Sequence, residues 1–256
     1  MVIVLHGLGG SCESFYVLRM AAVAYAAGHS TLRLNMRGAD NSGADTYHAG
    51  LTADVRGALA SPELARYRDV LLVGFSLGAN VSLRVAMLEN DPRLRAVVAI
   101  HPPLDLEATC QFIDHPRRIV YRRFLLQGLQ ENYDAVHALR GGPIDRERAW
   151  RIRFIRDWDD QVTAQRWGFV DASDYYARAS SGPRLGGLRI PSLIIAERRD
   201  PLIPASSLEP YLTTLRNRLT VRWTDRGGHV GYPARTHGSA LSLEQQVLDW
   251  LRDHHG

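Results

Sequence analysis

The chain has 256 residues, of which 45% are hydrophobic and 23% charged, a composition that fits one sizeable globular core and excludes a disordered or fibrous protein. No apolar run approaches the roughly 20 residues of a membrane-spanning helix, and the first residues lack the basic stretch of a secretory signal. The net charge is +4, but all 31 basic residues are arginine, which indicates codon bias, so we expect no nucleic-acid partner. Cys12 and Cys110 are too few for a disulfide framework, and we expect a cytoplasmic protein.

The first hundred residues alternate between predicted strands and helices. Short apolar runs rich in branched side chains predict buried strands at 2–5, 31–35, 69–75 and 95–100. Helical patterns lie between them, at 15–27, 51–67 and 77–89. This alternation predicts βαβ units and a parallel sheet that is covered by helices on both faces.

The alternation stops after residue 100 and returns near residue 191. Residues 102 to about 185 are rich in arginine and aromatic side chains, are mostly helical by pattern and contain no convincing strand. Strands at 191–197 and 219–225 and a helix at 241–253 then restore the alternation. We therefore predict one α/β core formed by residues 1–101 and 186–256, with a helical cap inserted at 102–185.

The predicted cap carries a block of positive charge. Between Gln111 and Arg156, ten arginines face five acidic residues, an excess of five. Such blocks usually face water and form ion pairs within helices. The alternative is a basic face that makes weak contact with a membrane or lipid surface.

The segment Gly74-Phe75-Ser76-Leu77-Gly78 matches the G-x-S-x-G nucleophile elbow, at the end of a predicted strand and the start of a predicted helix. The glycines are needed because the serine occupies a strained turn whose neighbours pass close to other backbone. Ser76 Oγ is thereby exposed at a helix N-terminus, whose partial positive charge favours a developing anion. A glycine-flanked turn whose serine has no catalytic role would share this pattern. The residues that partner Ser76 therefore decide between the two interpretations.

A serine hydroxyl needs a base to take its proton, and His229 is the histidine best placed to do so. It lies in a glycine-rich loop just after the last predicted strand, from which an imidazole can reach the strand ends. His6, His48 and His101 also lie near strand ends or in early loops. We expect these three to hold loops by hydrogen bonds.

The imidazole needs a carboxylate that fixes its tautomer and stabilises its cation. Asp200 follows the predicted strand 191–197 by three residues and completes the chain order serine, acid, histidine that accompanies this elbow. Asp225 also lies near a strand end and is the alternative. Its position four residues before His229 favours a role in capping its own turn.

An oxyanion that forms on a substrate carbonyl needs backbone donors already aimed at it. We expect these to be the amides of Leu77 and of Leu8, which lies in the segment His6-Gly7-Leu8-Gly9-Gly10 directly after the first strand. The same segment would also serve as an ordinary tight turn. No metal-ligand spacing and no phosphate-binding glycine loop follows a strand, so we expect neither a metal nor a dissociable cofactor.

Further motifs along nearly the whole chain resemble the YheT-type branch of the α/β-hydrolases, which includes eukaryotic abhydrolase-domain proteins. They are HGLGGS (6–11), NMRGADNSG (35–43), YHAG (47–50), GFSLGAN (74–80), DDQVTA (159–164), GFVDASDYY (168–176) and GGHVGY (227–232). The resemblance implies a serine esterase or lipase that cleaves carboxylic esters, with short-chain esters or acylglycerols as small-molecule substrates. It assigns the catalytic residues to Ser76, Asp200 and His229.

The resemblance also marks the 159–176 segment as an element of the cap, with no catalytic role that we can assign. By residue type, Asp159, Asp160, Tyr175 and Tyr176 are equally suited to bracing the cap against the core by hydrogen bonds.

Two departures from the family bear on these expectations. Relatives generally carry several dozen residues before the HGL motif, so we expect the first strands of the usual sheet to be missing and six strands to remain, ordered 4-3-5-6-7-8 in the fold's usual numbering, with an exposed edge. The chain also lacks a histidine followed by aspartate after four intervening residues, the acyltransferase pattern of some relatives, which favours water as the acceptor. A thioesterase, or an impaired or non-catalytic ligand-binding protein on the same fold, is the alternative.

Overall fold

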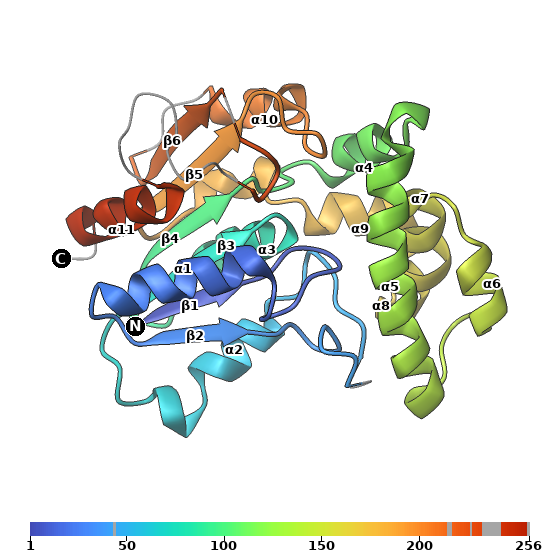
Figure 1. Cartoon of the computed structure of the whole chain (residues 1–256), viewed down its shortest axis with the longest axis horizontal. Helices are drawn as coiled ribbons and strands as arrows, with labels where there is room; N and C mark the ends of the chain where they lie inside the picture. The colour runs from blue at the N-terminus through green and yellow to red at the C-terminus, as the bar shows by residue number, and fades with distance from the viewer. Residues whose placement is uncertain (43–44, 214–216, 226, 232–241, 255–256) are drawn as a thin grey trace.

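A computed structural model describes residues 1–42, 45–213, 217–225, 227–231 and 242–254. Within these residues six strands form one fully parallel sheet in the order β2-β1-β3-β4-β5-β6 (Figure 1). The strands are β1 (Val2–Leu5), β2 (Thr31–Leu34), β3 (Val70–Phe75), β4 (Leu94–Ile100), β5 (Ser192–Glu197) and β6 (Leu219–Thr224). The predicted number of strands, their order and their parallel pairing are therefore confirmed, with β2 and β6 at the two edges.

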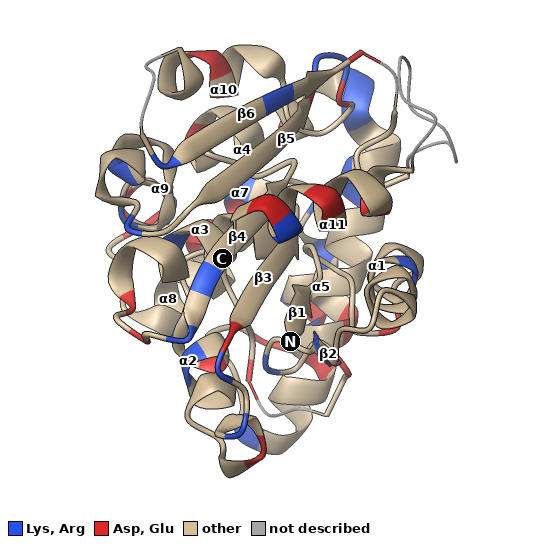
Figure 2. Ribbon diagram, turned by 90° about the vertical axis from the view of Figure 1, so that its left-hand side faces the viewer, with Lys and Arg blue, Asp and Glu red and all other residues tan. Residues whose placement is uncertain are grey.

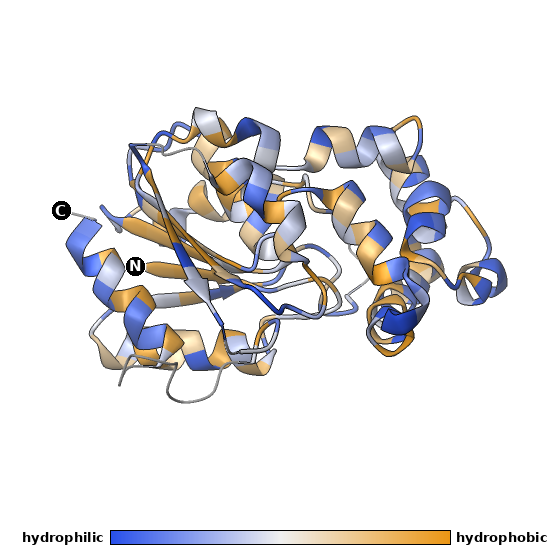
Figure 3. Ribbon diagram, turned by 90° about the horizontal axis from the view of Figure 1, so that it is seen from above, coloured by the Kyte–Doolittle hydropathy of each residue, from blue (hydrophilic) through white to orange (hydrophobic). Residues whose placement is uncertain are grey.

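Side chains of the strands alternate between two apolar layers. In β1, Val2 and Val4 pack in the layer that includes α1 (Phe15–Ala26) and α11 (Leu243–His254), whereas Ile3 and Leu5 pack in the opposite layer. That second layer includes α2 (Ala53–Leu59), α3 (Leu77–Leu88) and α10 (Ala205–Leu212). Because helices cover both faces, the interior strands β1 and β3 are buried along their whole length and carry no charged side chain (Figures 2 and 3).

One predicted helix is shorter than expected. The pattern over 51–67 predicts a single helix, but α2 ends at Leu59 and a separate 3₁₀ turn spans Pro62–Leu64. The reason is Ser61, which precedes a proline and adopts an extended conformation with ψ 143°. A residue before proline is disfavoured in the α region, so the helix must end ahead of it.

Between β4 and β5 the chain forms helices and turns only, and we call residues 101–191 the helical segment. Figures 1 and 3 place its helices α5 to α8 beyond the carboxyl ends of the strands, on the side toward which the strands point. In the described part of the chain, no helix is long and apolar enough to cross a membrane. The helices are α4 (Leu106–Asp114), α5 (Ile119–Arg140), α6 (Arg146–Arg151), α7 (Ile155–Trp158), α8 (Gln165–Trp167) and α9 (Ala172–Ala179), with a π-helix at Asp159–Ala164 and 3₁₀ turns at Pro116–Arg118 and Gly182–Gly187.

Three residues named in the expectations lie outside the described residues. They are Gly43 and Tyr232, each the last residue of a family motif, and Leu241, with which we expected the final helix to begin.

Candidate active site

Ser76 occupies a strained turn between β3 and α3. Its φ of 52° lies in the left-handed region, which is unfavourable for a residue with a side chain and is tolerated where the surrounding structure enforces it. The packing around this turn leaves no room for a Cβ at either glycine of the motif. A Cβ on Gly74 would lie 2.3 Å from the carbonyl oxygen of Gly78, and one on Gly78 would lie 2.3 Å from that of His6. The sequence G-x-S-x-G is thus a steric requirement of this turn.

Three side chains from distant segments form one chain of hydrogen bonds. His229 Nε2 lies 2.7 Å from Ser76 Oγ, and its Nδ1 lies 2.8 Å from Asp200 Oδ2. The other carboxylate oxygen, Oδ1, accepts hydrogen bonds from the amides of Leu202 and Ile203 at 2.7 and 3.0 Å. The structure therefore brings together the three residues that the sequence singles out as nucleophile, base and acid.

Asp200 is held as a carboxylate although it is buried. Burial opposes its ionisation, but hydrogen bonds from His101 and His229 outweigh that penalty and hold the pKa of Asp200 well below its ordinary value. His101 Nδ1 lies 2.8 Å from the same oxygen that His229 contacts, and the side chain of His101 is 1% exposed. An ionised acid in this position can fix the tautomer of His229 and stabilise its cation.

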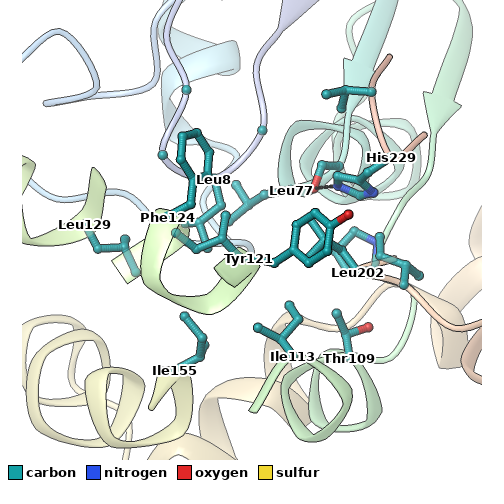
Figure 4. A pocket seen from close by; sticks show the side chains of 18 of the residues that line it. Leu8, Leu77, Thr109, Ile113, Tyr121, Phe124, Leu129, Ile155, Leu202 and His229 are labelled. Atoms are coloured by element: carbon teal, nitrogen blue, oxygen red, sulfur yellow. Dashed lines mark hydrogen bonds between the residues drawn. The ribbon is translucent and has the colours of Figure 1, made fainter. Parts of the chain in front are cut away.

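The site opens into a cavity of about 690 Å³ at the carboxyl ends of the strands. Ser76, Leu77 and His229 line one side, and side chains of α4, α5 and α7 line the other. Figure 4 shows Thr109, Ile113 and Ile155 across the cavity from His229. Most of the lining is aliphatic or aromatic, and a cavity of this size and character suits a small apolar ligand.

The comparisons with known proteins agree with this geometry. The sequence model of a family described as having the alpha/beta hydrolase fold matches residues 1–233. The chain belongs to the α/β-hydrolase family. It is 32% identical to the YheT protein of Escherichia coli strain K12 over 98% of its own length and 76% of that protein, which confirms the resemblance to the YheT-type branch.

Other relatives of this α/β-hydrolase carry esterase and lipase names. It is 28% identical to a monoacylglycerol lipase of Saccharomyces cerevisiae over 91% of its own length, and it spans 54% of that protein. Among solved structures, an esterase of Pyrococcus furiosus superposes with a TM-score of 0.63 at 16% identity, covering 100% of this chain and 83% of that one. The family is thus one of esterases and lipases, and the solved structure supports the fold.

Two tyrosines fix the loop that follows β1. Tyr16 OH accepts a hydrogen bond from the Gly7 amide at 3.0 Å, and Tyr47 OH accepts one from the Gly9 amide at 2.9 Å. No described residue accepts a hydrogen bond from the Leu8 amide between them. Burial raises the pKa of both tyrosines, so their hydroxyls stay neutral. The expectation that this loop presents the Leu8 amide is supported by a pair of residues that the sequence does not single out.

The Leu77 amide is available for a different reason. Leu77 is the first residue of α3, and the first amides of a helix have no partner in its own hydrogen-bond ladder. The loop and the elbow touch, since a Cβ on Gly7 would lie 3.0 Å from Ser76 Cβ. The loop that carries Leu8 therefore lies against the serine, and Leu77 follows the serine directly in the chain.

The three other histidines named from the sequence, His6, His48 and His101, divide into two groups. His6 Nδ1 donates to the Gly7 carbonyl while its Nε2 accepts from the Met36 amide, and His48 Nδ1 accepts from the Gly50 amide. These two hold loops, as expected. His101 differs from the expectation, because it contacts the carboxylate of Asp200.

His101 was identifiable in principle from the sequence. It directly follows β4, which pairs with β5, the strand that leads to Asp200. Asp225, the alternative acid, lies 3.4 Å from Arg198 and its side chain is 76% exposed. Its exposure and its arginine partner make it unsuitable for stabilising a buried imidazolium.

His101, Asp200 and His229 also form a group whose ligating atoms lie within 4.8 Å of one another, although the sequence shows no metal-ligand spacing. Both Nδ1 atoms lie 2.8 Å from one carboxylate oxygen, and that of His229 makes a hydrogen bond to it. The proton that His229 Nδ1 donates to the carboxylate prevents this nitrogen from ligating a metal. The arrangement therefore fits a carboxylate that is flanked by two imidazoles.

Proposed function

We propose that this α/β-hydrolase is a serine esterase in which Ser76 is the nucleophile, His229 the general base and Asp200 the acid that orients it. The observation that carries the proposal is the unbroken hydrogen-bond chain from Asp200 through His229 to Ser76 Oγ. We assign the oxyanion hole to the Leu8 and Leu77 amides.

The geometry implies a two-step reaction. His229 Nε2 takes the proton of Ser76 Oγ as that oxygen attacks the ester carbonyl, and the carbonyl oxygen becomes an oxyanion between the two amides. His229 then gives the proton to the leaving alcohol, and an acyl-enzyme remains on Ser76. Water, deprotonated by the same imidazole, cleaves the acyl-enzyme and restores the serine.

The apolar cavity supports esters with an apolar acyl chain, short-chain esters or acylglycerols, as substrates. The name of the yeast relative, a monoacylglycerol lipase, agrees with this substrate class. We propose that residues 102–185 form the cap over the cavity and that residues 1–101 and 186–256 form the core. The free thiols of Cys12 and Cys110 support a reducing, cytoplasmic setting.

A fluorophosphonate probe tests the proposal directly. We expect the wild-type protein to be labelled covalently and Ser76→Ala to remain unlabelled while keeping the same circular dichroism spectrum. A folded wild-type protein that resists labelling would favour the alternative, a non-catalytic binding protein. A panel of p-nitrophenyl esters of increasing acyl length, with matched thioesters, then defines the chain length and separates an esterase from a thioesterase.

We further propose that the mouth of the cavity rests on an anionic lipid surface. Phe15, Val120 and Phe124 line the cavity, yet their side chains are 53%, 75% and 69% exposed. Residues 115–130 around them include four arginines and no acidic residue. Each arginine near an anionic membrane contributes about 1 kcal/mol of attraction, and exposed apolar side chains can insert between headgroups.

Cosedimentation with vesicles tests the lipid contact. We expect binding to vesicles that contain phosphatidylglycerol and much weaker binding to pure phosphatidylcholine. The double variant Val120→Asp with Phe124→Asp should weaken binding about tenfold or more. Leu139→Asp is the matched control, because Leu139 is 71% exposed on the same helix but does not line the cavity. Equal binding by the double variant and the control would refute the proposal.

A further inference from the structure

The wall of the cavity that faces the serine contains an acidic group that the proposed reaction does not use. Asp159 directly follows α7, the helix that places Ile155 across the cavity from His229 (Figure 4). Of the described residues that line the cavity, Asp159 alone carries a carboxyl group. An ionisable group in an otherwise apolar wall needs an explanation, because burying it is costly.

The contacts of Asp159 do not join the helical segment to the sheet. Its Oδ1 accepts a hydrogen bond from Thr163 Oγ1 at 2.8 Å, and its Oδ2 accepts one from Tyr176 OH at 2.7 Å. Both donors belong to the helical segment itself. The bracing contact is made by Tyr175, whose hydroxyl accepts a hydrogen bond from the Ala49 amide at 3.0 Å. Of the two tyrosines, Tyr175 therefore fulfils the expectation of bracing, and Asp159 is left without that role.

The protein does not fully compensate the charge of Asp159. A carboxylate has about four acceptor positions, and two are used here. The nearby Arg156 is engaged with Glu107 and Ser173, and no arginine among the described residues pairs with Asp159. Burial accordingly raises the pKa of Asp159 to about 7. The group can therefore accept further hydrogen bonds, and in its protonated form it can also donate one.

A second polar group in the same wall is unsatisfied. Thr109 lines the cavity and is 6% exposed, and its Oγ1 has no hydrogen-bond partner among the described residues. It is adjacent to Cys110, whose Sγ lies 3.1 Å from the hydroxyl of Tyr176. A buried hydroxyl without a partner costs about 1 to 3 kcal/mol and is rare in native proteins.

The backbone at Asp159 is also unusual. Asp159 begins a π-helix, a distortion that recurs at functional sites.

We propose that Asp159 and Thr109 form a polar subsite that binds free hydroxyl groups on the alcohol part of the ester, as in a partial glycerol ester. This assignment rests on the proposed esterase function and narrows its substrate class. A hydroxyl both donates and accepts, so it can pair with Asp159 in either protonation state and with the threonine. A permanent cation would suit only the ionised form and would lose its hydration in an apolar cavity.

The test compares two esters that share one acyl chain, 1-decanoylglycerol and methyl decanoate. Both form the same acyl-enzyme, so a difference in kcat/KM reports on the alcohol part. We expect the wild type to prefer the glycerol ester. Asp159→Ala should lower kcat/KM for the glycerol ester about 10-fold to 100-fold, the range for a lost hydrogen bond to a charged group, and leave the methyl ester within about twofold.

Thr109→Val keeps the test decisive if Asp159→Ala folds poorly. It removes only an unpartnered hydroxyl, so it should fold as well as the wild type and still lower the preference for glycerol ester, about threefold to tenfold. The matched control is Asp157→Asn. Asp157 is two residues from Asp159, is exposed and lies outside the cavity lining, so this change should leave kcat/KM unchanged for both esters.

Two results would overturn the subsite. One is a parallel loss on both esters in Asp159→Ala together with an unchanged preference in Thr109→Val. The other is a loss on decanoylcholine larger than on the glycerol ester, which would make the site one for cations. Fluorophosphonate labelling of each variant separates this failure from failure of the esterase proposal, since a labelled protein without glycerol preference contradicts the subsite alone.

Discussion

The two walls of the cavity are built in different ways. The wall at the strand ends carries Ser76, His229 and Asp200, each fixed by backbone geometry and by hydrogen bonds to the next. The wall formed by the helical segment carries Asp159 and Thr109, which have acceptor or donor capacity left over. The difference indicates a division of labour, in which the strand ends supply the chemistry and the helices supply the fit to a substrate.

The sharpest test of this division is Asp200→Asn. An amide cannot stabilise an imidazolium and favours the wrong tautomer of His229, so kcat should fall about 10³-fold to 10⁴-fold. The control is Asp225→Asn, where the replaced side chain is 76% exposed and kcat should not change. Initial rates on a p-nitrophenyl ester measure both. Similar losses in the two variants would mean that the acid has been assigned wrongly.

A second test concerns how rigidly the strand-end wall is built. Gly78→Ala places a Cβ 2.3 Å from the carbonyl oxygen of His6, so backbone must move, and we expect a loss of about 3 kcal/mol or more in the free energy of unfolding. Gly57→Ala is the control, since nothing lies within 4 Å of the added methyl group in α2 and the change should stabilise by about 0.5 to 1 kcal/mol. Urea unfolding followed by circular dichroism distinguishes them. Equal stability of the two variants would contradict the steric account of the elbow.

The same contrast explains what the sequence could predict. Each predicted strand matches the observed one to within one residue at either end, because a parallel sheet covered on both faces demands continuous apolar runs. Ser76, Asp200 and His229 were predictable for a related reason. Each follows a strand, and parallel strands bring their carboxyl ends to one edge of the sheet.

The helical wall was not predictable to that depth. A helical pattern indicates which residues are apolar but not which neighbour a given face meets, so nothing in the sequence pairs Asp159 with Tyr176 or places Thr109 in the cavity. The sequence also did not predict the hydrogen bonds that fix the loop after β1, from the Gly7 amide to Tyr16 and from the Gly9 amide to Tyr47. Those contacts join residues that no periodicity relates.

Acid should weaken the contact between the two walls. His48 lies in the loop after β2 and packs against the rings of Trp167, Phe169 and Tyr175 of the helical segment. Burial, reinforced by nearby arginines, lowers the pKa of His48 to about 4. In the unfolded chain the His48 imidazole binds a proton near pH 6.5, whereas in the folded protein it stays neutral down to about pH 4. The free energy of unfolding should therefore fall as the pH drops from 6.5 to 4, by about 3 kcal/mol for this residue.

The measurement compares wild type with His48→Asn by urea unfolding between pH 7.5 and 4.5. Asparagine keeps an acceptor for the Gly50 amide but does not titrate, so the variant should lose less stability on acidification than the wild type. The two proteins are compared with each other because Asp159 is present in both. Its raised pKa makes the free energy of unfolding increase as the pH falls through the same range, which is opposite to the effect of His48. Parallel pH curves for the two proteins would show that His48 is not buried as a neutral ring.

The smallest effect is expected at His101, and it probes how strongly the strand-end wall depends on its supporting contacts. His101 Nδ1 lies 2.8 Å from the same oxygen of Asp200 that His229 contacts, so His101→Leu removes one of the two imidazole contacts that keep the acid ionised. We expect kcat/KM to fall about tenfold. His101→Asn should lose less, because an amide nitrogen can replace Nδ1 and asparagine tolerates the φ of 51° at this position. Activities are compared per folded protein, as judged by circular dichroism. If both variants retain full activity, the amides of Leu202 and Ile203 and the imidazole of His229 suffice to hold Asp200, and the second imidazole serves packing alone.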